Sequence, residues 1–360
     1  MRLPLDRWIK KFAFELYAPY GWARSPRYVT LDLTRRCNLR CNICFYYGSE
    51  KESFKFDELS EKEIISRIIN RFSGINYYIT GGEPFLRNDI LNILRAIRQN
   101  GSRSSISTNG TLITSDLAKS IIGENLLDLI HVSIYGLEKT HDNITRFPNS
   151  ISRSLKGIEY LLNERRRLGL KKPGIGIACT ITRTNMNEVK GLIELAESIG
   201  LDEIVFGQAS FSTPEITMEH QKVMSHLGLK CEDPYDELLS APPDIEISQD
   251  DLECYIETLI TSRIKNIQKI HTSPKGYTGE DIRKHYTDLT WKYKSSCTYP
   301  WHNLRVGPDG TVTPCVGYVV GNVRDKDIKT IWNNTRFRNF RSILYKQKLF
   351  PGCVRCCKLK

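Results

Sequence analysis

Six short runs rich in β-branched residues alternate with longer amphipathic runs across residues 28–212 of this 360-residue chain. The apolar runs predict strands at 28–33, 75–80, 104–109, 129–134, 174–181 and 203–208. The amphipathic runs predict helices at 61–72, 89–98, 150–168 and 187–199. Because this order needs crossover connections, it indicates a parallel sheet with helices outside. Right-handed crossovers curl such a sheet, so we expect an α/β fold, a partial (β/α)6 TIM-like barrel.

Three cysteines, Cys37, Cys41 and Cys44, follow the first predicted strand in the run CNLRCNIC. Three thiolates are one short of the four that close a [4Fe-4S] cluster, so one iron keeps an open coordination position. An open position is typical of a reactive site, by analogy with zinc. A structural zinc site is the alternative, but no histidine lies near this loop. Eleven cysteines and no secretory signal argue against disulfides and favour a reducing, cytoplasmic location.

Glycine and polar residues end the next three predicted strands. They are Gly81, Gly82, Glu83 and Pro84 after the second strand, Thr108 and Asn109 at the end of the third, and Ser133 in the fourth. The two glycines permit positive φ and close backbone approach to a ligand. Because sites in such barrels form at the carboxyl ends of the strands, we expect these residues beside the cysteine loop.

CNLRCNIC after a strand, with GGEP after the next, resembles the signature of the radical S-adenosylmethionine (radical SAM) superfamily. The resemblance implies that the open iron binds the amino and carboxylate groups of SAM. It implies that an electron from the cluster cleaves the sulfonium, and that the resulting 5′-deoxyadenosyl radical abstracts a hydrogen atom from a substrate. A flavodoxin- or ferredoxin-type protein would donate the electron. The protein itself supplies binding, orientation and shielding.

The resemblance also implies roles at single positions. The turn at 81–84 would hold the SAM amino group, with Glu83 as a support rather than a catalytic base. Thr108 and Asn109 would lie near SAM, and Ser133 would contact its ribose or methionine part.

Three further positions fit the family pattern less closely. The backbone of Ile43 would meet the adenine, although the family usually has an aromatic residue there. Tyr135 replaces the usual acidic residue two places after Ser133. Arg146 would hold the SAM carboxylate. No residue is assigned as a catalytic acid or base.

The C-terminal region carries a second group of cysteines. Cys297 and Cys315 flank a predicted hairpin with a PDG turn, and Cys353 and Cys356 follow near the end, with Cys357 adjacent. Four thiolates can fill every iron of a second cluster. The pattern resembles a twitch domain, a shortened relative of the SPASM domain, and predicts a small α+β extension with one auxiliary [4Fe-4S] cluster. Zinc on the same four cysteines, and the choice between Cys356 and Cys357, stay open.

Four segments are therefore predicted: an amphipathic segment at 1–27, the radical SAM partial barrel at 28–212, a bridging or lid segment at 213–296, and the auxiliary cluster domain at 297–360. Residues 1–20 are basic and amphipathic, which suggests peripheral membrane contact, although packing under the barrel is the preferred interpretation. The net charge of +11 is spread along the chain without a recognition motif, so nucleic acid is not an expected partner.

The expected function is radical SAM chemistry on a small molecule such as a sugar, cyclitol or lipid headgroup, with the auxiliary cluster assisting oxidation or rearrangement. Only about 27 residues precede the barrel, which is short for a peptide-recognition domain. A peptide-modifying enzyme is the first alternative. A non-catalytic iron–sulfur or zinc protein that binds nucleic acid is the alternative from another class.

Overall fold

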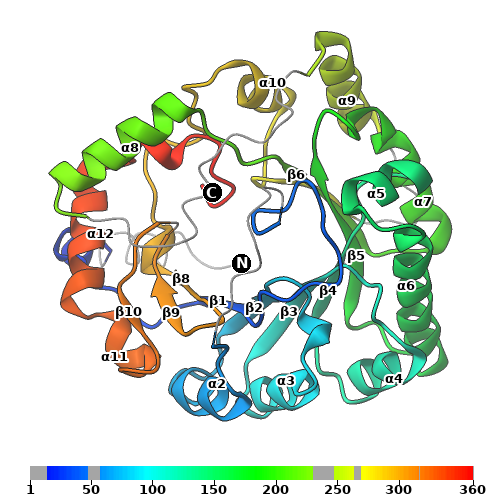
Figure 1. Ribbon diagram of the computed structural model, residues 1–360, viewed down its shortest axis with the longest axis horizontal. Coiled ribbons are helices and arrows are strands. Elements are labelled where there is room, and N and C mark those ends of the chain that lie inside the picture. The colour runs from blue at the N-terminus through cyan, green and yellow to red at the C-terminus, as the bar shows by residue number, and fades with distance from the viewer. Residues whose placement is uncertain (1–13, 48–56, 230–246, 263–268, 316, 360) are drawn as a thin grey trace, which may run out of the picture.

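The computed structural model describes residues 14–47, 57–229, 247–262, 269–315 and 317–359. Its strands form one sheet in the order β10-β9-β8-β1-β2-β3-β4-β5-β6-β7. Strands β1 to β7 pair in parallel as they follow in the chain, and β8 pairs in parallel with the other side of β1. Figure 1 shows this curved sheet with helices around its outer side. The expected partial TIM-like barrel is confirmed.

The strands are β1 (Tyr28–Asp32), β2 (Asn76–Thr80), β3 (Arg103–Thr108), β4 (Leu129–Ser133), β5 (Gly174–Ile181), β6 (Glu203–Gln208), β7 (Lys269–Ser273), β8 (Asn303–Val306), β9 (Thr311–Thr313) and β10 (Gly321–Asn322). The helices are α2 (Glu61–Arg67), α3 (Ile90–Gln99), α4 (Ser115–Gly123), α5 (Glu138–Thr145), α6 (Ser150–Arg167), α7 (Val189–Ile199), α8 (Pro214–His226), α9 (Gln249–Thr261), α10 (Gly279–Thr287), α11 (Ile328–Trp332) and α12 (Thr335–Gln347).

Alternating residues give each barrel strand two different faces. In β1, Val29 and Leu31 are buried in the core, whereas Thr30 and Asp32 line a cavity inside the barrel. In β2 the same alternation buries Ile79 in the core and turns Tyr78 to the cavity. Because side chains of a strand alternate between the faces of the sheet, the polar positions in these runs form the inner wall.

Several elements differ from the sequence expectation. The predicted helix at 61–72 ends as α2 at Arg67, because Ile68 leaves the helical region with φ −120°, and a 3₁₀ turn (Ile69–Arg71) follows. The short helices α4 and α5 were not predicted. A seventh parallel strand, β7, lies within the predicted bridging segment and pairs with β6. Helix α9 also lies within the predicted bridging segment and ends at Thr261.

The C-terminal hairpin forms where expected, but it is part of the barrel sheet. Strands β8 and β9 pair antiparallel through a turn in which Gly310 has φ +87° and its N–H donates to the Gly307 carbonyl at 3.0 Å. Arg305 of β8 is in register with Thr30 of β1. The segment boundaries predicted at 212/213 and 296/297 stay a proposal, and the sheet continues across both.

The described part of the N-terminal segment packs on the protein itself. The Phe14 ring lies 5.6 Å from that of Trp301. The buried Arg341 guanidinium donates to the carbonyls of Gly21 (3.3 Å) and Pro300 (2.7 Å), which joins this segment to the C-terminal region. Residues 1–13 of the segment predicted to contact a membrane lie outside the described residues. In its described part Leu16 and Tyr20 are exposed, and the membrane contact stays a prediction. In the described chain, no helix combines the length and apolar character that crossing a bilayer requires.

Gly21 provides a test of this packing. It has φ +72°, and a Cβ atom there would lie 1.9 Å from the Arg338 carbonyl oxygen, whereas Gly74 has φ +67° with open space around it. Both substitutions to Ala carry the left-handed backbone cost of roughly 1–2 kcal/mol. We expect Gly21→Ala to lose about 1–3 kcal/mol more, because the backbone of α12 must shift. Urea unfolding of the two variants measures this, and equal midpoints would contradict it.

Candidate functional site: a cavity between two groups of cysteines

A cavity of about 440 Å³ lies at the carboxyl ends of the barrel strands. Its walls come from both ends of the chain: the cysteine loop after β1, the ends of β1 to β5, and the segment that follows α12. In Figure 1 this region lies within the curve of the sheet, where the red C-terminal segment approaches the blue loop that follows β1. The fold therefore brings the two groups of cysteines to one cavity, as the strand order predicts.

Main-chain hydrogen bonds hold the cysteine loop. The Cys44 N–H donates to the Cys41 carbonyl at 3.2 Å, which curls the loop. The N–H groups of Arg40 and Asn42 donate to carbonyls of the last turn of α5, at 3.2 and 2.9 Å. Because those carbonyls lack partners within their own helix, α5 provides a ready anchor.

The three thiols of this loop favour a positively charged partner. Cys37, Cys41 and Cys44 are half-buried free thiols that line the cavity. Burial raises the pKa of Cys37 to about 11 and that of Cys41 to about 12, and the other two cysteines add to the rise at Cys41. Thiolates bind metal, so such a group needs a cation to ionise at neutral pH. This donor set fits an iron–sulfur cluster. In the described chain, no three His, Cys, Asp or Glu side chains form a single-ion site.

The glycine turn after β2 lies directly against the start of the cysteine loop. The N–H groups of Gly82 and Glu83 donate to the carbonyls of Thr34 (2.7 Å) and Arg36 (2.8 Å). A Cβ atom on Gly82 would lie 2.2 Å from the Arg36 carbonyl oxygen, and Gly81 has φ +132°. Only glycine permits this approach, so the turn supports the backbone that leads into Cys37.

Glu83 connects the glycine turn to the end of β3. Its fully buried carboxylate accepts hydrogen bonds from the Thr108 hydroxyl and the Asn109 N–H, both at 2.7 Å. The Asn109 amide in turn donates to the Asn38 side chain at 2.9 Å. Neither Glu83 nor Pro84 lines the cavity, whereas Gly81, Thr108 and Asn109 do. This placement is consistent with a supporting rather than a catalytic Glu83.

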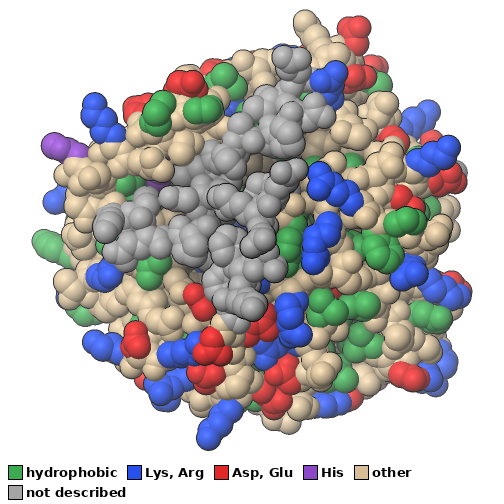
Figure 2. All heavy atoms as spheres, viewed as in Figure 1, with side chains coloured by type: hydrophobic (Ala, Val, Ile, Leu, Met, Phe, Trp, Pro, Cys, Tyr) green, Lys and Arg blue, Asp and Glu red, His purple; other side chains and the backbone are tan. Residues whose placement is uncertain are grey.

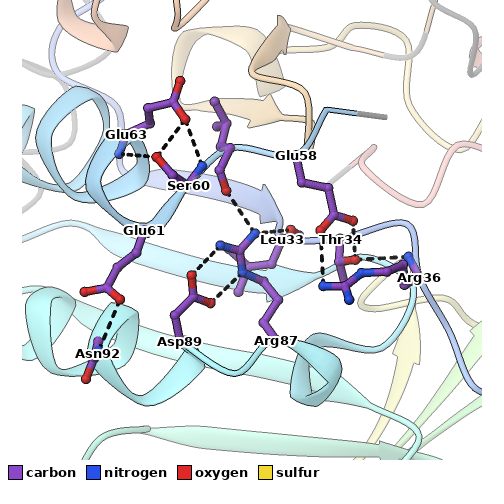
Figure 3. A network of polar contacts seen from close by, with 11 residues as sticks. Leu33, Thr34, Arg36, Glu58, Ser60, Glu61, Glu63, Arg87, Asp89 and Asn92 are labelled. Atoms are coloured by element: carbon purple, nitrogen blue, oxygen red, sulfur yellow. Dashed lines mark hydrogen bonds and ion pairs between the residues drawn. The ribbon is translucent and has the colours of Figure 1, made fainter. Parts of the chain in front are cut away.

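A polar network behind the turn fixes the end of β1 (Figure 3). The buried Arg87 guanidinium donates to the Leu33 carbonyl at 3.0 Å and pairs with Asp89 at 2.6 Å. Glu58 accepts from the Thr34 hydroxyl and from Arg36. The guanidinium satisfies a strand-end carbonyl that has no ladder partner, so the loop starts from a fixed point.

The remaining predicted SAM contacts divide into two groups. Ile43 and Ser133 line the cavity, as does Tyr135. Arg146 does not: it ends α5 with φ +53° and lines a separate groove on the outer side of the cysteine loop. The SAM-binding roles of all these residues stay predictions.

Most of the C-terminal cysteines line the same cavity. They are Cys315, Cys353, Cys356 and Cys357, whereas Cys297 is half-buried and does not line it. Burial raises the pKa of Cys297 to about 12, and the nearby Cys353 adds to this rise. Burial also raises the pKa of Cys356, with contributions from Cys357 and Cys353. These thiols therefore suit a second cationic group, and the identity of its fourth ligand stays a prediction.

Sequence reasoning missed one polar group in the cavity. Asp32, at the end of β1, accepts hydrogen bonds from Arg305 Nε (2.6 Å) and the Tyr46 hydroxyl (3.1 Å). Arg305 belongs to β8, and Tyr46 follows the cysteine loop. Inside the cavity the Asp32 carboxylate therefore links the C-terminal part of the chain to the segment after the cysteine loop. The sequence signal for this group is Asp32 itself, a charged residue at a strand position that faces inward. A buried carboxylate requires a partner, so this position predicts a charged or hydrogen-bonding neighbour.

Comparisons with known proteins agree with this arrangement. Residues 31–196 match the model of the radical SAM superfamily, and residues 297–357 match the SPASM iron–sulfur cluster-binding domain. A tungsten-containing aldehyde ferredoxin oxidoreductase cofactor-modifying protein of Pyrococcus furiosus is 25% identical over 350 residues, which cover 92% of this chain and 87% of that protein. A probable GTP 3′,8-cyclase of Metallosphaera sedula is 30% identical over 56% of this chain and 64% of its own length.

Solved structures share the fold. Streptococcus suis SuiB bound to its precursor peptide SuiA has a TM-score of 0.62 at 17% identity, covering 95% of this chain and 73% of SuiB. The protein anSMEcpe with bound AdoMet and a peptide has a TM-score of 0.54 at 18% identity, covering 93% of this chain and 88% of that one.

The fold and the cavity thus define an iron–sulfur protein with a barrel domain and a C-terminal cluster-binding domain. The chain belongs to the radical SAM superfamily and carries a C-terminal SPASM domain. Its cofactors are SAM with a [4Fe-4S] cluster in the barrel and auxiliary iron–sulfur in the SPASM domain.

Gly82→Ala tests the role of the glycine turn. The added Cβ must displace the Arg36 carbonyl and with it the cysteine loop, so we expect iron in the anaerobically reconstituted protein to fall by about four per chain. Gly123→Ala is the matched control, because a Cβ there meets nothing within 4 Å. Full iron content in Gly82→Ala, with an electron paramagnetic resonance signal that still responds to SAM, would disprove the role.

Single substitutions test the predicted ligands of the auxiliary cluster. With two clusters the protein should hold about eight irons per chain, and Cys353→Ala should hold about four. We expect Cys356→Ala to behave like Cys353→Ala, and Cys357→Ala to keep all eight. If Cys357→Ala loses the four irons and Cys356→Ala keeps them, the fourth ligand is Cys357. Zinc in place of the second set of irons would exclude the cluster.

Proposed function

We propose that this protein cleaves SAM reductively and abstracts a hydrogen atom from an amino acid side chain of a peptide. The cavity that two sets of cysteines share carries the proposal. When bound, SAM and the barrel cluster supply a 5′-deoxyadenosyl radical, and auxiliary iron–sulfur accepts the electron that the oxidised substrate gives up. Loss of one hydrogen atom, one electron and one proton then amounts to a two-electron oxidation.

The residues of this chain hold and shield the reactants in that proposal. Cys37, Cys41 and Cys44 would bind the barrel cluster, and the turn at Gly82 keeps their loop in place. The lining of the cavity includes apolar side chains: Phe211, Met224, Phe340, Phe350 and Val354. An apolar wall excludes water and accommodates one side chain of a peptide, which favours controlled radical chemistry.

The solved structures support a peptide substrate. SuiB and anSMEcpe were both crystallised with peptides, and their folds cover more than nine tenths of this chain. That likeness concerns architecture, so the substrate class itself stays our proposal.

A small molecule, the substrate expected from the sequence, is the second candidate. It is favoured by the names of two relatives, a cofactor-modifying protein and a probable GTP 3′,8-cyclase. Thr30, Tyr78 and Thr80 give the inner wall hydroxyl groups that suit a polar ring.

The first experiment measures SAM cleavage. Anaerobically reconstituted protein with SAM and dithionite should release 5′-deoxyadenosine, and Cys37→Ala should release none, because its loop lacks a ligand. Release of equal amounts by the variant would refute radical SAM activity.

The second experiment identifies the substrate class. Cells that produce the wild type are compared with cells that produce Cys37→Ala, by mass spectrometry of their peptide and metabolite fractions. Loss of two hydrogen atoms from a peptide, only with the wild type, supports the main proposal. The same change confined to a metabolite supports the second candidate and excludes the first.

A further inference from the structure

The proposed function requires an electron from outside, and the inference below rests on it. The electron must reach the barrel cluster through the surface nearest to Cys37, Cys41 and Cys44. These cysteines are half-buried, so their loop lies close to the surface. Its backbone is hydrogen-bonded to the last turn of α5 by Arg40 and Asn42. The end of α5 and the turn into α6 therefore form the outer surface beside the proposed cluster.

Four exposed cations lie along α5 and around its C-terminal end: Arg40, Lys139, Arg146 and Arg153. We call them the α5 basic patch. Lys139 and Arg146 line one groove of about 770 Å³ together with Phe147. The Arg153 guanidinium lies 5.1 Å from the Phe147 ring, and the Arg40 N–H bonds the Thr145 carbonyl at 3.2 Å. Lys139, Arg146 and Arg153 therefore share one surface through Phe147, and the main chain of Arg40 is bonded to its edge.

Two carboxylates of the same groove, Glu138 and Asp142, offset part of the charge of the patch, so its four cations leave an excess of two positive charges. Asp142 accepts hydrogen bonds from the N–H groups of Asn149 (2.6 Å) and Ile151 (3.1 Å), so it caps the start of α6. Glu138 is the exposed acid of the groove. In Figure 2, Lys and Arg side chains lie on the front face near the region that α5 occupies in Figure 1. The surface therefore has an excess of positive charge.

The patch also lies within electrostatic reach of the cysteine loop. Burial raises the pKa of Cys41, and the Arg146 guanidinium opposes that rise. Yet the groove and the cavity share no lining residue. The cysteine loop thus separates an outer basic surface from an inner substrate cavity, which lets a protein partner and a substrate bind at the same time.

The backbone of the groove is held in an uncommon conformation. Arg146 and Asn149 both have positive φ, at +53° and +59°. Non-glycine residues in this region cost free energy and concentrate at functional surfaces. The chain turns sharply between α5 and α6 at these two residues. Phe147 and Pro148 lie at this turn and provide apolar contact area among the cations.

We propose that the α5 basic patch is the docking surface for an acidic one-electron carrier protein that reduces the barrel cluster. Each encounter would transfer one electron from the reduced carrier to the cluster, which matches one SAM cleaved. Opposite charge steers such encounters and sets their rate, and an apolar centre with a polar rim suits a transient interface. In this assignment Arg146 serves docking rather than the SAM carboxylate.

The test compares two reductants. The double charge reversal Lys139→Glu with Arg153→Glu alters the patch without touching a predicted SAM contact or a cysteine. Its control is Lys326→Glu with Lys329→Glu, two exposed cations at α11 that change the net charge equally. Release of 5′-deoxyadenosine is measured with reduced flavodoxin and, separately, with dithionite.

We expect the patch variant to be about tenfold slower than the wild type with flavodoxin at low salt and unchanged with dithionite. The flavodoxin difference should shrink at 1 M salt, where the screening length falls to about 3 Å. The control pair should match the wild type in both assays. An equal loss with dithionite, an equal loss in the control pair, or no loss with flavodoxin would each overturn the docking surface. Absence of 5′-deoxyadenosine from the wild type with dithionite would instead refute the proposed function.

Discussion

The site depends on one constraint. The backbone of the turn after β2 lies directly against the backbone of the loop after β1. The N–H groups of Gly82 and Glu83 donate hydrogen bonds to the carbonyls of Thr34 and Arg36. These bonds require glycine, because any side chain at position 82 would occupy the space of the Arg36 carbonyl. The buried Glu83 then extends the same contact to β3 through Thr108 and Asn109. Three strand ends are thus fixed relative to one another before any cofactor binds.

A second constraint fixes the auxiliary domain. Strand β8 pairs with β1 along its length, and Asp32 pairs with Arg305 at the cavity end of that pairing. The C-terminal cysteines stand before and after β8 and β9, two strands that belong to the barrel sheet. Main-chain geometry therefore sets the separation between the two groups of cysteines. The buried charge pair fixes the register of β8 against β1.

Most of the fold could be predicted from the sequence, because strand periodicity is a local signal. The runs that became β1 to β6 carry β-branched residues on a two-residue alternation, and GGEP and CNLRCNIC stand at their ends. What escaped prediction is non-local or weakly patterned. Nothing near Arg305 indicates that its strand pairs with residues 28–31, and β7 is a five-residue run inside a segment with mixed charge. Helix α5 is short and polar, with Ile144 as its one apolar side chain, yet its last carbonyls anchor the cysteine loop. The position of Arg146 outside the cavity also depends on that helix.

The parallel pairing of β8 with β1 has a consequence for the integrity of the chain. Without residues 297–360, β1 would become a bare edge strand with unpaired N–H and C=O groups beside an apolar core. Such an edge is a template for intermolecular pairing and aggregation. The C-terminal extension thus protects the barrel from self-association, and it is not a detachable module. Loss of its metal would weaken the extension, and with it the pairing of β8 that covers the edge of β1.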